Sequence, residues 1–380
     1  MHKAAPLIPP LTPGQERIVL SGLTSIQSDG KIIIGGFFVT YNGTTRNRIA
    51  RLNVDGTLDG SFNTGTGASS FVLTISIQSD GKIIIGGFFT PYNGIARNRI
   101  ARLNVDGTLD GSFDQGTGAD AGVQNTSIQS DGKIIIGGDF ESYNGIARNR
   151  IARLNVDGTL DDSFDPGTGA DASVRTISIQ SDGKIIIGGQ FTTYNGIARN
   201  QIARLNADGS LDGTFDPGSG ADERVWTTSI QSDGKIIIGG FFTTYDGIAR
   251  NRIARLNTDG TLDETFNPGA GTDFEIQTSS IQSNGEIIIG GAFSSYNGIA
   301  RNKIARLNID GTLDIAFNPG TGTNGNVLTT SIQSDGNIII GGSFNFYNGT
   351  GRNMIARILG GTTMGFSSIS NSTSIMVYPN

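Results

Sequence analysis

Apolar and polar residues follow one order that repeats along almost the whole chain. The stretch at 25–36 reads S-I-Q-S-D-G-K-I-I-I-G-G, and its Ile-Gln pair returns every 51 residues. The seven pairs begin at Ile26, Ile77, Ile128, Ile179, Ile230, Ile281 and Ile332. A repeat of this length predicts one supersecondary unit per copy, and each unit must stack on its neighbours to bury its apolar faces.

The fourth unit is representative and predicts four strands. Residues 174–180 have the β-branched content of a strand, and 184–189 are an Ile run typical of a strand buried on both faces. Residues 202–206 and 211–215 supply the other two strands, and Asp-Gly turns or an Asn-Gly loop join them. The predicted fold class is therefore all-β: a seven-bladed β-propeller of four-stranded blades.

The two ends of the chain carry complementary parts of the repeat. Residues 7–12 match the outer-strand part of a unit, while the seventh unit ends without that part. We therefore expect residues 1–12 to supply the outer strand of the last blade and to close the ring, with the propeller over residues 13–359. A rival interpretation takes this strand from residues 364–368, which match the pattern less well.

Composition narrows the classes of partner. The chain has 380 residues, 57 of them Gly, and a formal charge of −6, so it lacks the basic surface that nucleic acid requires. It has no cysteine, which excludes disulfides and thiolate metal sites. No apolar run approaches the roughly 18 residues that a membrane helix needs, and residues 1–11 do not form a signal peptide. We expect neither nucleic-acid binding nor membrane insertion.

The sequence offers few residues that could form a catalytic site. The only His is His2, and most carboxylates recur at one position in about seven units, whereas an acid–base pair has to break that symmetry. The exceptions lie in different units or positions: Glu141, Glu223, Glu264, Glu275 and Glu286. We therefore expect no enzyme, and a polysaccharide-active hydrolase or lyase is the low-ranked alternative.

The N-x-D-G-x-L-D turns, such as the one at 53–59, place oxygen-bearing side chains at their first, third and seventh positions. This loosely resembles a calcium loop but lacks the further carboxylates and the terminal bidentate Glu. We interpret each segment as a hairpin turn in which Asn and Asp cap backbone groups. No cofactor is expected, and calcium at these turns is the alternative.

Two arginines recur in every unit. The strand arginine, Arg51 in the first unit, is predicted to point between blades and to pair with Asp59, because an unpaired buried charge costs several kcal/mol. The loop arginine, Arg46 in the first unit, either braces its loop on carbonyl groups or belongs to a ring of seven cations on one face.

The candidate site comes from positions where the seven copies disagree. One opens the first strand of each unit and reads Gly22, Leu73, Gln124, Arg175, Trp226, Gln277 and Leu328; a second follows the double Gly and reads Phe37, Phe88, Asp139, Gln190, Phe241, Ala292 and Ser343. Because inner strands crowd around the axis, we expect the first set to rim the mouth of the central channel. The candidate ligand-binding residues are Leu73, Gln124, Arg175, Glu223, Arg224, Trp226, Phe274, Gln277 and Leu328.

Trp226 is the only Trp, and with its charged neighbours it has the chemistry to stack a sugar or clamp a peptide. The competing interpretation is sequence drift at solvent-exposed positions.

The units resemble the delta-sixty repeat family. Its S-I-Q-x-D-G-K-I-I-I-G-G, Y-N-G, R-N-x-I-A-R-L-N, D-G-x-L-D and F-N-P-G elements occur nearly intact in every copy, over about residues 7–358. The resemblance implies a bacterial propeller with a layout related to kelch propellers. That family carries no established chemistry, so no catalytic residue transfers from it.

The C-terminal residues carry a second resemblance. Residues 360–380 are a Ser/Thr/Asn-rich linker that ends in V-Y-P-N, similar to the opening of the C-terminal sorting domain of type IX secretion in Bacteroidetes. This resemblance implies a precursor that continues past Asn380 and is exported to the cell surface.

These observations favour a secreted or cell-surface propeller that acts in binding or adhesion. We expect a monomer that recognises a carbohydrate or a protein through the loops around the channel mouth. Near-identical blades also suit a multivalent lectin with one weak site per blade. The alternative class is a structural spacer or assembly subunit with no small ligand.

Overall fold

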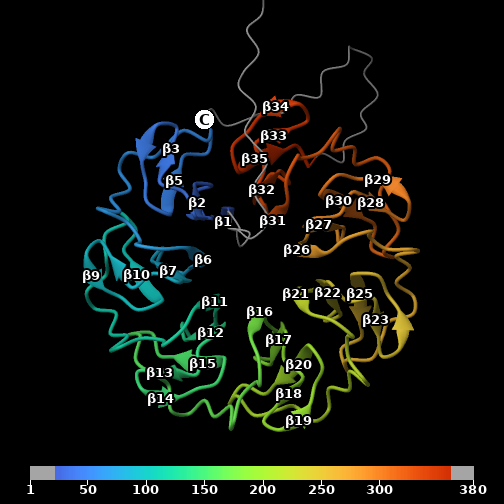
Figure 1. The fold of residues 1–380 in the computed structure, drawn as a ribbon, viewed down its shortest axis with the longest axis horizontal. Coiled ribbons are helices and arrows are strands. Elements are labelled where there is room, and N and C mark those ends of the chain that lie inside the picture. The colour runs from blue at the N-terminus through green and yellow to red at the C-terminus, as the bar shows by residue number, and fades with distance from the viewer. Residues whose placement is uncertain (1–21, 361–380) are drawn as a thin grey trace, which may run out of the picture.

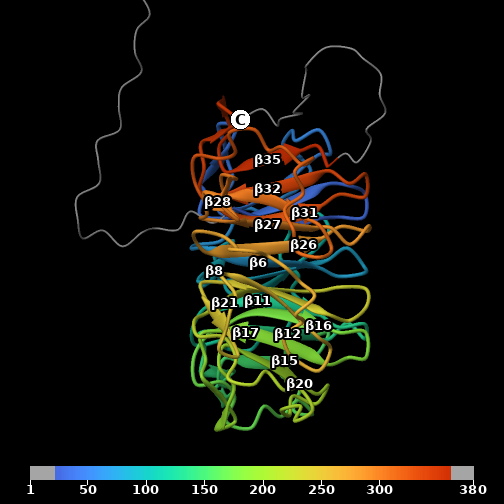
Figure 2. The ribbon, with the colours of Figure 1, turned by 90° about the vertical axis from the view of Figure 1, so that its right-hand side faces the viewer.

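The computed structural model describes residues 22–360, which form seven similar units arranged in a ring (Figure 1). Each unit is a three-stranded antiparallel sheet with a separate two-stranded hairpin. The first strand of each sheet lies nearest the axis and the hairpins lie toward the circumference (Figure 1). Seen from the side, the ring is a thick disc (Figure 2). Residues 22–360 contain no helix, and the predicted seven-bladed propeller is confirmed.

The three strands of each sheet differ in their distance from the axis. The innermost strands are β1 (Gly22–Ile26), β6 (Val72–Ile77), β11 (Val123–Ile128), β16 (Val174–Ile179), β21 (Val225–Ile230), β26 (Ile276–Ile281) and β31 (Val327–Ile332). The middle strands are β2 (Ile32–Gly36), β7 (Ile83–Gly87), β12 (Ile134–Gly138), β17 (Ile185–Gly189), β22 (Ile236–Gly240), β27 (Ile287–Gly291) and β32 (Ile338–Gly342). The outer strands are β5 (Ile49–Leu52), β10 (Ile100–Leu103), β15 (Ile151–Leu154), β20 (Ile202–Leu205), β25 (Ile253–Leu256), β30 (Ile304–Leu307) and β35 (Ile355–Ile358).

The hairpins connect the middle and outer strands, and each consists of two short strands. They are β3 (Thr40–Tyr41) with β4 (Thr44–Thr45), β8 (Pro91–Tyr92) with β9 (Ile95–Ala96), β13 (Ser142–Tyr143) with β14 (Ile146–Ala147), β18 (Thr193–Tyr194) with β19 (Ile197–Ala198), β23 (Thr244–Tyr245) with β24 (Ile248–Ala249), β28 (Ser295–Tyr296) with β29 (Ile299–Ala300), and β33 (Phe346–Tyr347) with β34 (Thr350–Gly351).

The fourth predicted strand is reduced to one bridge. In the fourth unit, Leu211 pairs with Leu205 as an isolated bridge, and residues 211–215 do not continue as a strand. The cause is local, because Asp212 folds the chain back on itself. Its carboxylate accepts hydrogen bonds from the backbone N–H and the hydroxyl of Thr214, at 2.9 and 2.7 Å. Side-chain capping of this kind competes with a strand ladder.

The middle strands are fully buried, as the Ile runs predict. The double Gly at the end of each middle strand lets two neighbours come close: the inner strand of the next unit and a carbonyl group of its own unit. A Cβ on Gly86 would lie 2.7 Å from the Val123 side chain of the next unit, and one on Gly87 would lie 2.0 Å from the carbonyl oxygen of Phe71. Neither position has room for a side chain, which explains why the repeat keeps both glycines.

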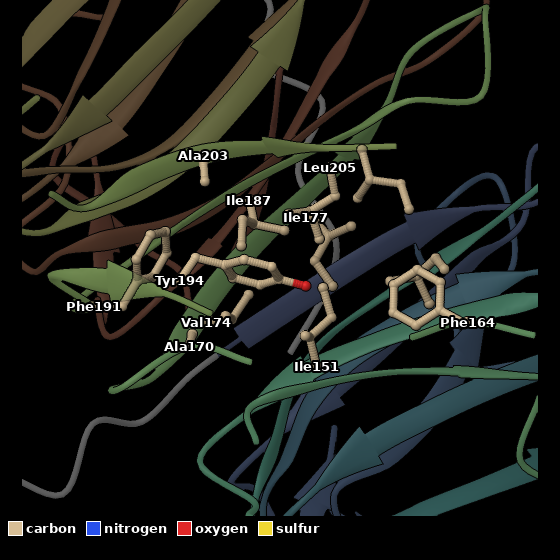
Figure 3. Packing of buried hydrophobic residues seen from close by; sticks show 12 residues of the cluster. Ile151, Phe164, Ala170, Val174, Ile177, Ile187, Phe191, Tyr194, Ala203 and Leu205 are labelled. Carbon is tan, nitrogen blue, oxygen red and sulfur yellow. The ribbon is translucent and has the colours of Figure 1, made fainter. Parts of the chain in front are cut away.

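The apolar core lies between adjacent sheets. Figure 3 shows Ile151 and Phe164 of the third unit beside Val174, Ile187 and Tyr194 of the fourth, in one buried cluster. The Tyr194 hydroxyl donates a hydrogen bond to the Gly209 carbonyl at 2.8 Å, so this polar group is satisfied inside the core. Burial raises the pKa of Tyr194, which keeps its hydroxyl neutral.

A buried arginine joins each sheet to the next one. Arg153 Nε donates to Asp161 Oδ2 at 2.6 Å, and its Nη1 donates to the Ala207 carbonyl of the fourth unit. Lys133 Nζ donates to the same carboxylate oxygen at 2.8 Å. The predicted strand-arginine pairing is thereby confirmed, and it recurs at Arg51–Asp59, Arg102–Asp110, Arg204–Asp212, Arg255–Asp263 and Arg306–Asp314.

The loop arginine adopts the bracing arrangement, the first of its two interpretations. Arg148 Nη1 donates to the carbonyl of Ala147 at 2.9 Å, and the same contact to the preceding carbonyl forms at Arg97, Arg199, Arg250 and Arg301. A side chain held against its own loop stiffens the hairpin.

Hydroxyl groups link the innermost strands around the axis. Ser76 Oγ donates to the Thr126 carbonyl of the next unit at 2.9 Å, and equivalent bonds join units four to five, five to six and six to seven. The series also joins the last unit to the first, because Ser331 Oγ donates to the Thr24 carbonyl at 3.1 Å. Ile32 and Ala50 share an apolar cluster with Ile339 of the seventh unit. The first and seventh units therefore lie side by side, as Figure 1 shows.

The predictions about the chain ends concern residues outside the described range of 22–360. They are the closing strand from residues 1–12, the rival strand from 364–368, and the linker over 360–380 apart from Gly360.

The hydroxyl bond between the last and first units predicts a measurable contribution to stability. Ser331→Ala should lower the free energy of unfolding by about 1 kcal/mol, because it removes a hydrogen bond and leaves the Thr24 carbonyl without that partner. Ser127→Ala is the matched control, because no bond to the next unit is found for Ser127, where Ile177 takes the place of a hydroxyl residue. Equal losses in urea unfolding would contradict the role of the bond.

The buried ion pair predicts a larger effect. Asp161→Asn leaves the Arg153 guanidinium, 9% exposed, without its carboxylate and should cost about 3 kcal/mol. Asp162→Asn is the control, since the Asp162 side chain is 84% exposed. The measurement is thermal or urea unfolding of both variants. A loss for Asp161→Asn no larger than that for Asp162→Asn would show that the pair is not needed.

The same pair gives the fold a dependence on pH. Burial raises the pKa of Asp161, but hydrogen bonds from Lys133, Ser163 and Arg153 lower it by more, so the net pKa lies well below the usual value. The folded state then binds fewer protons than the unfolded state, so the contribution is complete above about pH 4 and is lost as the pH falls further. The melting temperature should drop steeply below that pH, and less steeply in Asp161→Asn.

Candidate ligand-binding surface at one mouth of the ring

The first variable position is a β-bulge. In six units the pairing of the inner and middle strands skips one residue, between Val174 and Thr176 in the fourth unit for example. The skipped residues are Leu73, Gln124, Arg175, Trp226, Gln277 and Leu328. The first unit pairs Gly22 with Gly36 and Leu23 with Gly35, without a skip. A bulged residue leaves the ladder and its side chain is re-aimed, which frees this position from the constraints of the sheet.

The bulges lie at the same end of the ring. In the six bulged units the skipped residue is the second residue of the inner strand, and the inner strands encircle the axis (Figure 1). Their bulged side chains are half-buried in all six units. The structure therefore gathers these candidates around one mouth of the ring.

The second variable position lies beside the first. The residue after the double Gly donates its backbone N–H to the carbonyl two residues before the bulge, as from Phe241 to Arg224 at 2.9 Å. The same bond joins Phe88 to Phe71 and Asp139 to Gly122. Two sets that are 15 residues apart in the sequence thus form one surface.

A third position adds a cation to this surface in five of the seven units. Residues 48, 99, 150, 201, 252, 303 and 354 have positive φ between 64° and 68° although none is Gly. Such a backbone is costly for a non-Gly residue. Arg150 Nη1 donates to the Asp139 carbonyl at 3.1 Å, and Lys303 Nζ donates to the Ala292 carbonyl at 2.9 Å. The turn thus brings these long side chains to the second variable position.

Aromatic rings and arginines meet in the fourth and fifth units. The Arg175 guanidinium carbon is 5.2 Å from the centre of the Trp226 ring, and that of Arg224 is 5.7 Å from it. Arg224 is also 5.7 Å from the Phe241 ring, which forms an edge-to-face pair with Phe274 at a centroid distance of 5.8 Å. Cation–π attraction of this kind holds a guanidinium against an aromatic face. We call Arg175, Arg224, Trp226, Phe241 and Phe274 the arginine–tryptophan cluster.

Acidic and amide groups border the cluster. Gln124 Nε2 donates to Asp139 Oδ2 at 2.6 Å, and Asp139 Oδ1 lies 4.0 Å from Arg175 Nη2. On the other side Glu223 Oε2 is 3.6 Å from Arg224 Nε. Burial and the nearby Arg224 lower the pKa of Arg175, while Asp139 acts in the opposite direction. The Arg175 guanidinium is thus partly desolvated, and the two arginines have their nearest carboxylate oxygens at 4.0 and 3.6 Å, beyond hydrogen-bond distance.

Other candidates lie apart from this cluster. Gln277 donates from Nε2 to Glu275 Oε1 at 2.9 Å. Leu73 and Leu328 occupy the bulges of the second and seventh units, and within residues 22–360 no ring or polar contact joins them to the cluster. The candidates that the structure brings together are Gln124, Arg175, Glu223, Arg224, Trp226 and Phe274.

A second aromatic group lies in the first and second units. Phe37 stacks on Phe71 with ring centres 4.2 Å apart, and Phe71 meets the edge of Phe88 at 6.5 Å. Arg48 lies 5.4 Å from the Phe37 ring. Phe88 is 42% exposed, so the group presents an aromatic face to solvent.

Sequence reasoning left Asp139, Phe241 and Arg252 out of the candidate set. Asp139 and Phe241 were recognisable as members of the second variable position, but their contact with the first depends on a pairing that the sequence does not reveal. Arg252, 5.9 Å from the Phe241 ring, belongs to a loop motif that hardly varies among the copies. Its only signal is modest variation at that position, which reads Gln201, Lys303 and Met354 in other units.

A cavity of about 590 Å³ lies elsewhere, at the junction of the first and seventh units. Leu23, Ile34 and Phe38 line it from the first unit, and Asn345 and Met354 from the seventh. None of the residues of the arginine–tryptophan cluster lines this cavity.

The N-x-D-G turns use their carboxylates within the turn. Asp55 Oδ1 accepts from the Thr57 backbone N–H at 2.9 Å and from its hydroxyl at 2.6 Å. These bonds lower the pKa of Asp55. Among residues 22–360 no group of three or more acidic or His side chains is placed to hold a metal ion.

Comparison with known proteins identifies the family. The family model described as "Domain of unknown function (DUF5122) beta-propeller" matches seven times, at residues 27–62, 78–113, 129–164, 180–215, 231–266, 282–317 and 333–360. These matches span more than half of the chain, and the protein belongs to this family of β-propeller repeats. None of the curated proteins compared with the chain matches it.

Two similar solved structures show the same fold. Both are crystal structures of the extracellular domain of BT4673 from B. thetaiotaomicron, called a one component system in one case and a hybrid two component system in the other. The TM-scores are 0.56 and 0.55 with 16% sequence identity; each alignment covers 90% of this chain and 38% of the BT4673 chain. The chain thus spans less than two fifths of those structures.

No helix among residues 22–360 is long and apolar enough to cross a membrane.

The geometry of the turns predicts that calcium does not stabilise the fold. Because the Asp55 carboxylate is already bonded within its own turn, EDTA should leave the melting temperature unchanged. Differential scanning calorimetry with and without added calcium chloride measures this. A rise of several degrees on adding calcium would assign the turns to a metal site.

Proposed function

We propose that this propeller is a secreted or cell-surface binding module, not an enzyme, that recognises a carbohydrate at the arginine–tryptophan cluster. The observation that carries this proposal is the break in symmetry. The scaffold repeats nearly unchanged seven times, whereas the bulges and the positions beside them differ from unit to unit and bring aromatic rings and guanidinium groups together. Exposed aromatic rings with a few polar groups are typical of sugar-binding surfaces.

The β-bulges support this role physically. A residue outside the ladder can change without a change of strand register, so the fold tolerates a specialised surface here. The carboxylates that border the cluster, on Asp139 and Glu223, face cations and an amide. This arrangement suits recognition better than acid–base chemistry, which needs two carboxyl groups on either side of a substrate bond.

The extracellular placement is supported by the resemblance of the C-terminal residues to a type IX sorting domain and by one fold neighbour. The BT4673 structures are of an extracellular domain, and 38% of that chain aligns with the fold of this one. We propose the same placement for this chain, acting as a monomer.

The proposal predicts that binding depends on the cluster. Trp226→Ala should weaken binding on a glycan array at least tenfold, because it removes the ring against which Arg175 and Arg224 lie. Leu328→Ala, at the equivalent bulge of the seventh unit, is the matched control and should bind like the parent protein. The melting temperature of each variant checks that it is folded.

Two results would contradict the proposal. A blank array for the parent protein would argue for a protein partner or a structural role. Equal binding by the parent and Trp226→Ala would move the site to the loops that recur in every blade.

A further inference from the structure

Two arginine side chains lie against the Trp226 ring, so we reconsider whether this ring stacks directly on a sugar. Arg175 and Arg224 come from the fourth unit and from the connection into the fifth, and both guanidinium groups lie within 5.7 Å of the ring centre. A sugar ring that stacked on this Trp would compete with the guanidinium groups for the ring. The Trp therefore positions the two arginines, and the open aromatic surface nearby is Phe274, which is 43% exposed.

The hydrogen-bonding capacity of both arginines is unused within the described chain. Neither Arg175 nor Arg224 donates a side-chain hydrogen bond to any of residues 22–360, and Arg175 Nε is buried without a partner. Their nearest carboxylate oxygens are 4.0 and 3.6 Å away. By contrast, the structural Arg153 bonds Asp161 at 2.6 Å. A guanidinium group offers five N–H donors in a planar fork that matches a carboxylate.

The position of these donors is accessible. The Arg175 side chain is 23% exposed and that of Arg224 is 40% exposed, so a ligand at the mouth can reach both. Asp139 keeps its short bond to Gln124 and does not neutralise Arg175 closely. Asp139 and Glu223 lie 4.0 and 3.6 Å from the two guanidinium groups, so they offset part of the positive charge but leave the N–H donors open to a ligand.

We propose that Arg175 and Arg224 bind the carboxylate of a uronic-acid unit in an acidic polysaccharide, with Trp226 as the positioning residue and Phe274 as a stacking surface. This inference rests on the proposed carbohydrate function and specifies its ligand class. An acidic polysaccharide presents both features that the cluster offers: a carboxylate for the guanidinium groups and a flat sugar ring for the exposed Phe. An acidic peptide shares only the carboxylate.

The experiment is isothermal titration calorimetry with oligomers of galacturonate, glucuronate and mannuronate. Each oligomer is compared with its methyl ester, which has the same sugar rings without the charges, and with a poly-glutamate peptide. We expect at least one of the three uronate oligomers to bind at least tenfold more tightly than its ester. We also expect its affinity to fall as salt is raised, since charge attraction is screened.

Variants assign the binding to the two arginines. Arg175→Gln and Arg224→Gln should each weaken binding of that oligomer about tenfold or more, while binding of the ester should change little. Arg199→Gln is the control, because this loop arginine has its Nη1 bonded to the Ala198 carbonyl in its own hairpin. Arg224→Lys tests whether the paired N–H donors of the guanidinium group matter. It keeps the positive charge, so we expect an affinity between those of the parent protein and Arg224→Gln.

The outcomes separate this inference from the broader proposal. Tight binding of neutral glycans or of the esters, unaffected by Arg224→Gln, would overturn the uronate assignment and leave carbohydrate binding standing. Poly-glutamate binding as tightly as the uronates would assign the cluster to an acidic protein. No binding of any saccharide would overturn both proposals.

Discussion

No blade of this propeller has an interior of its own. The Ile runs of the middle strands are buried on both faces only because the neighbouring sheets cover them, and the first Gly of each double Gly lets the next sheet approach to van der Waals contact. The buried arginine joins the same neighbours, bonding Asp161 in its own unit and a carbonyl in the next. Stability is therefore a property of the junctions, as in other repeat proteins. This dependence explains why the 51-residue unit is so uniform.

The packing between blades also determines which positions of the repeat can differ from unit to unit. Residues within the junctions have fixed partners on two sides, whereas a bulged residue at the start of the inner strand lies outside the ladder. Arg175 and Trp226 occupy such positions, and the cluster they form spans two neighbouring units without altering the sheet of either. A nearly symmetric scaffold can thus carry one asymmetric surface.

The sequence predicted the fold well because the repeat supplies seven independent observations of one unit. The buried Ile strands, the Asp-Gly turns and the Arg153–Asp161 pair all followed from residue type and spacing. The short fourth strand did not, because the capping of Asp212 on Thr214 competes locally with the strand pattern. The β-bulges were not predicted either, because one skipped residue in the strand pairing changes neither the composition of the strand nor the 51-residue period of the repeat.

The candidate site was predictable only in part. Variation among the copies pointed to Trp226 and Arg175, but not to their contact, which joins two units. It also did not show that Asp139 and Phe241 reach the same surface, because that depends on a backbone bond between the strand ends. Arg252 gave the weakest signal, since its loop barely varies.

One measurement tests the central claim directly, because Trp226 is the only Trp in the chain and reports on the cluster. Its fluorescence should change saturably on titration with a uronate oligomer, with a midpoint that matches the dissociation constant from calorimetry. The methyl ester should give a much weaker response. Tight binding by calorimetry without any change in the Trp226 emission would contradict the account, because the ligand would then lie away from the arginine–tryptophan cluster.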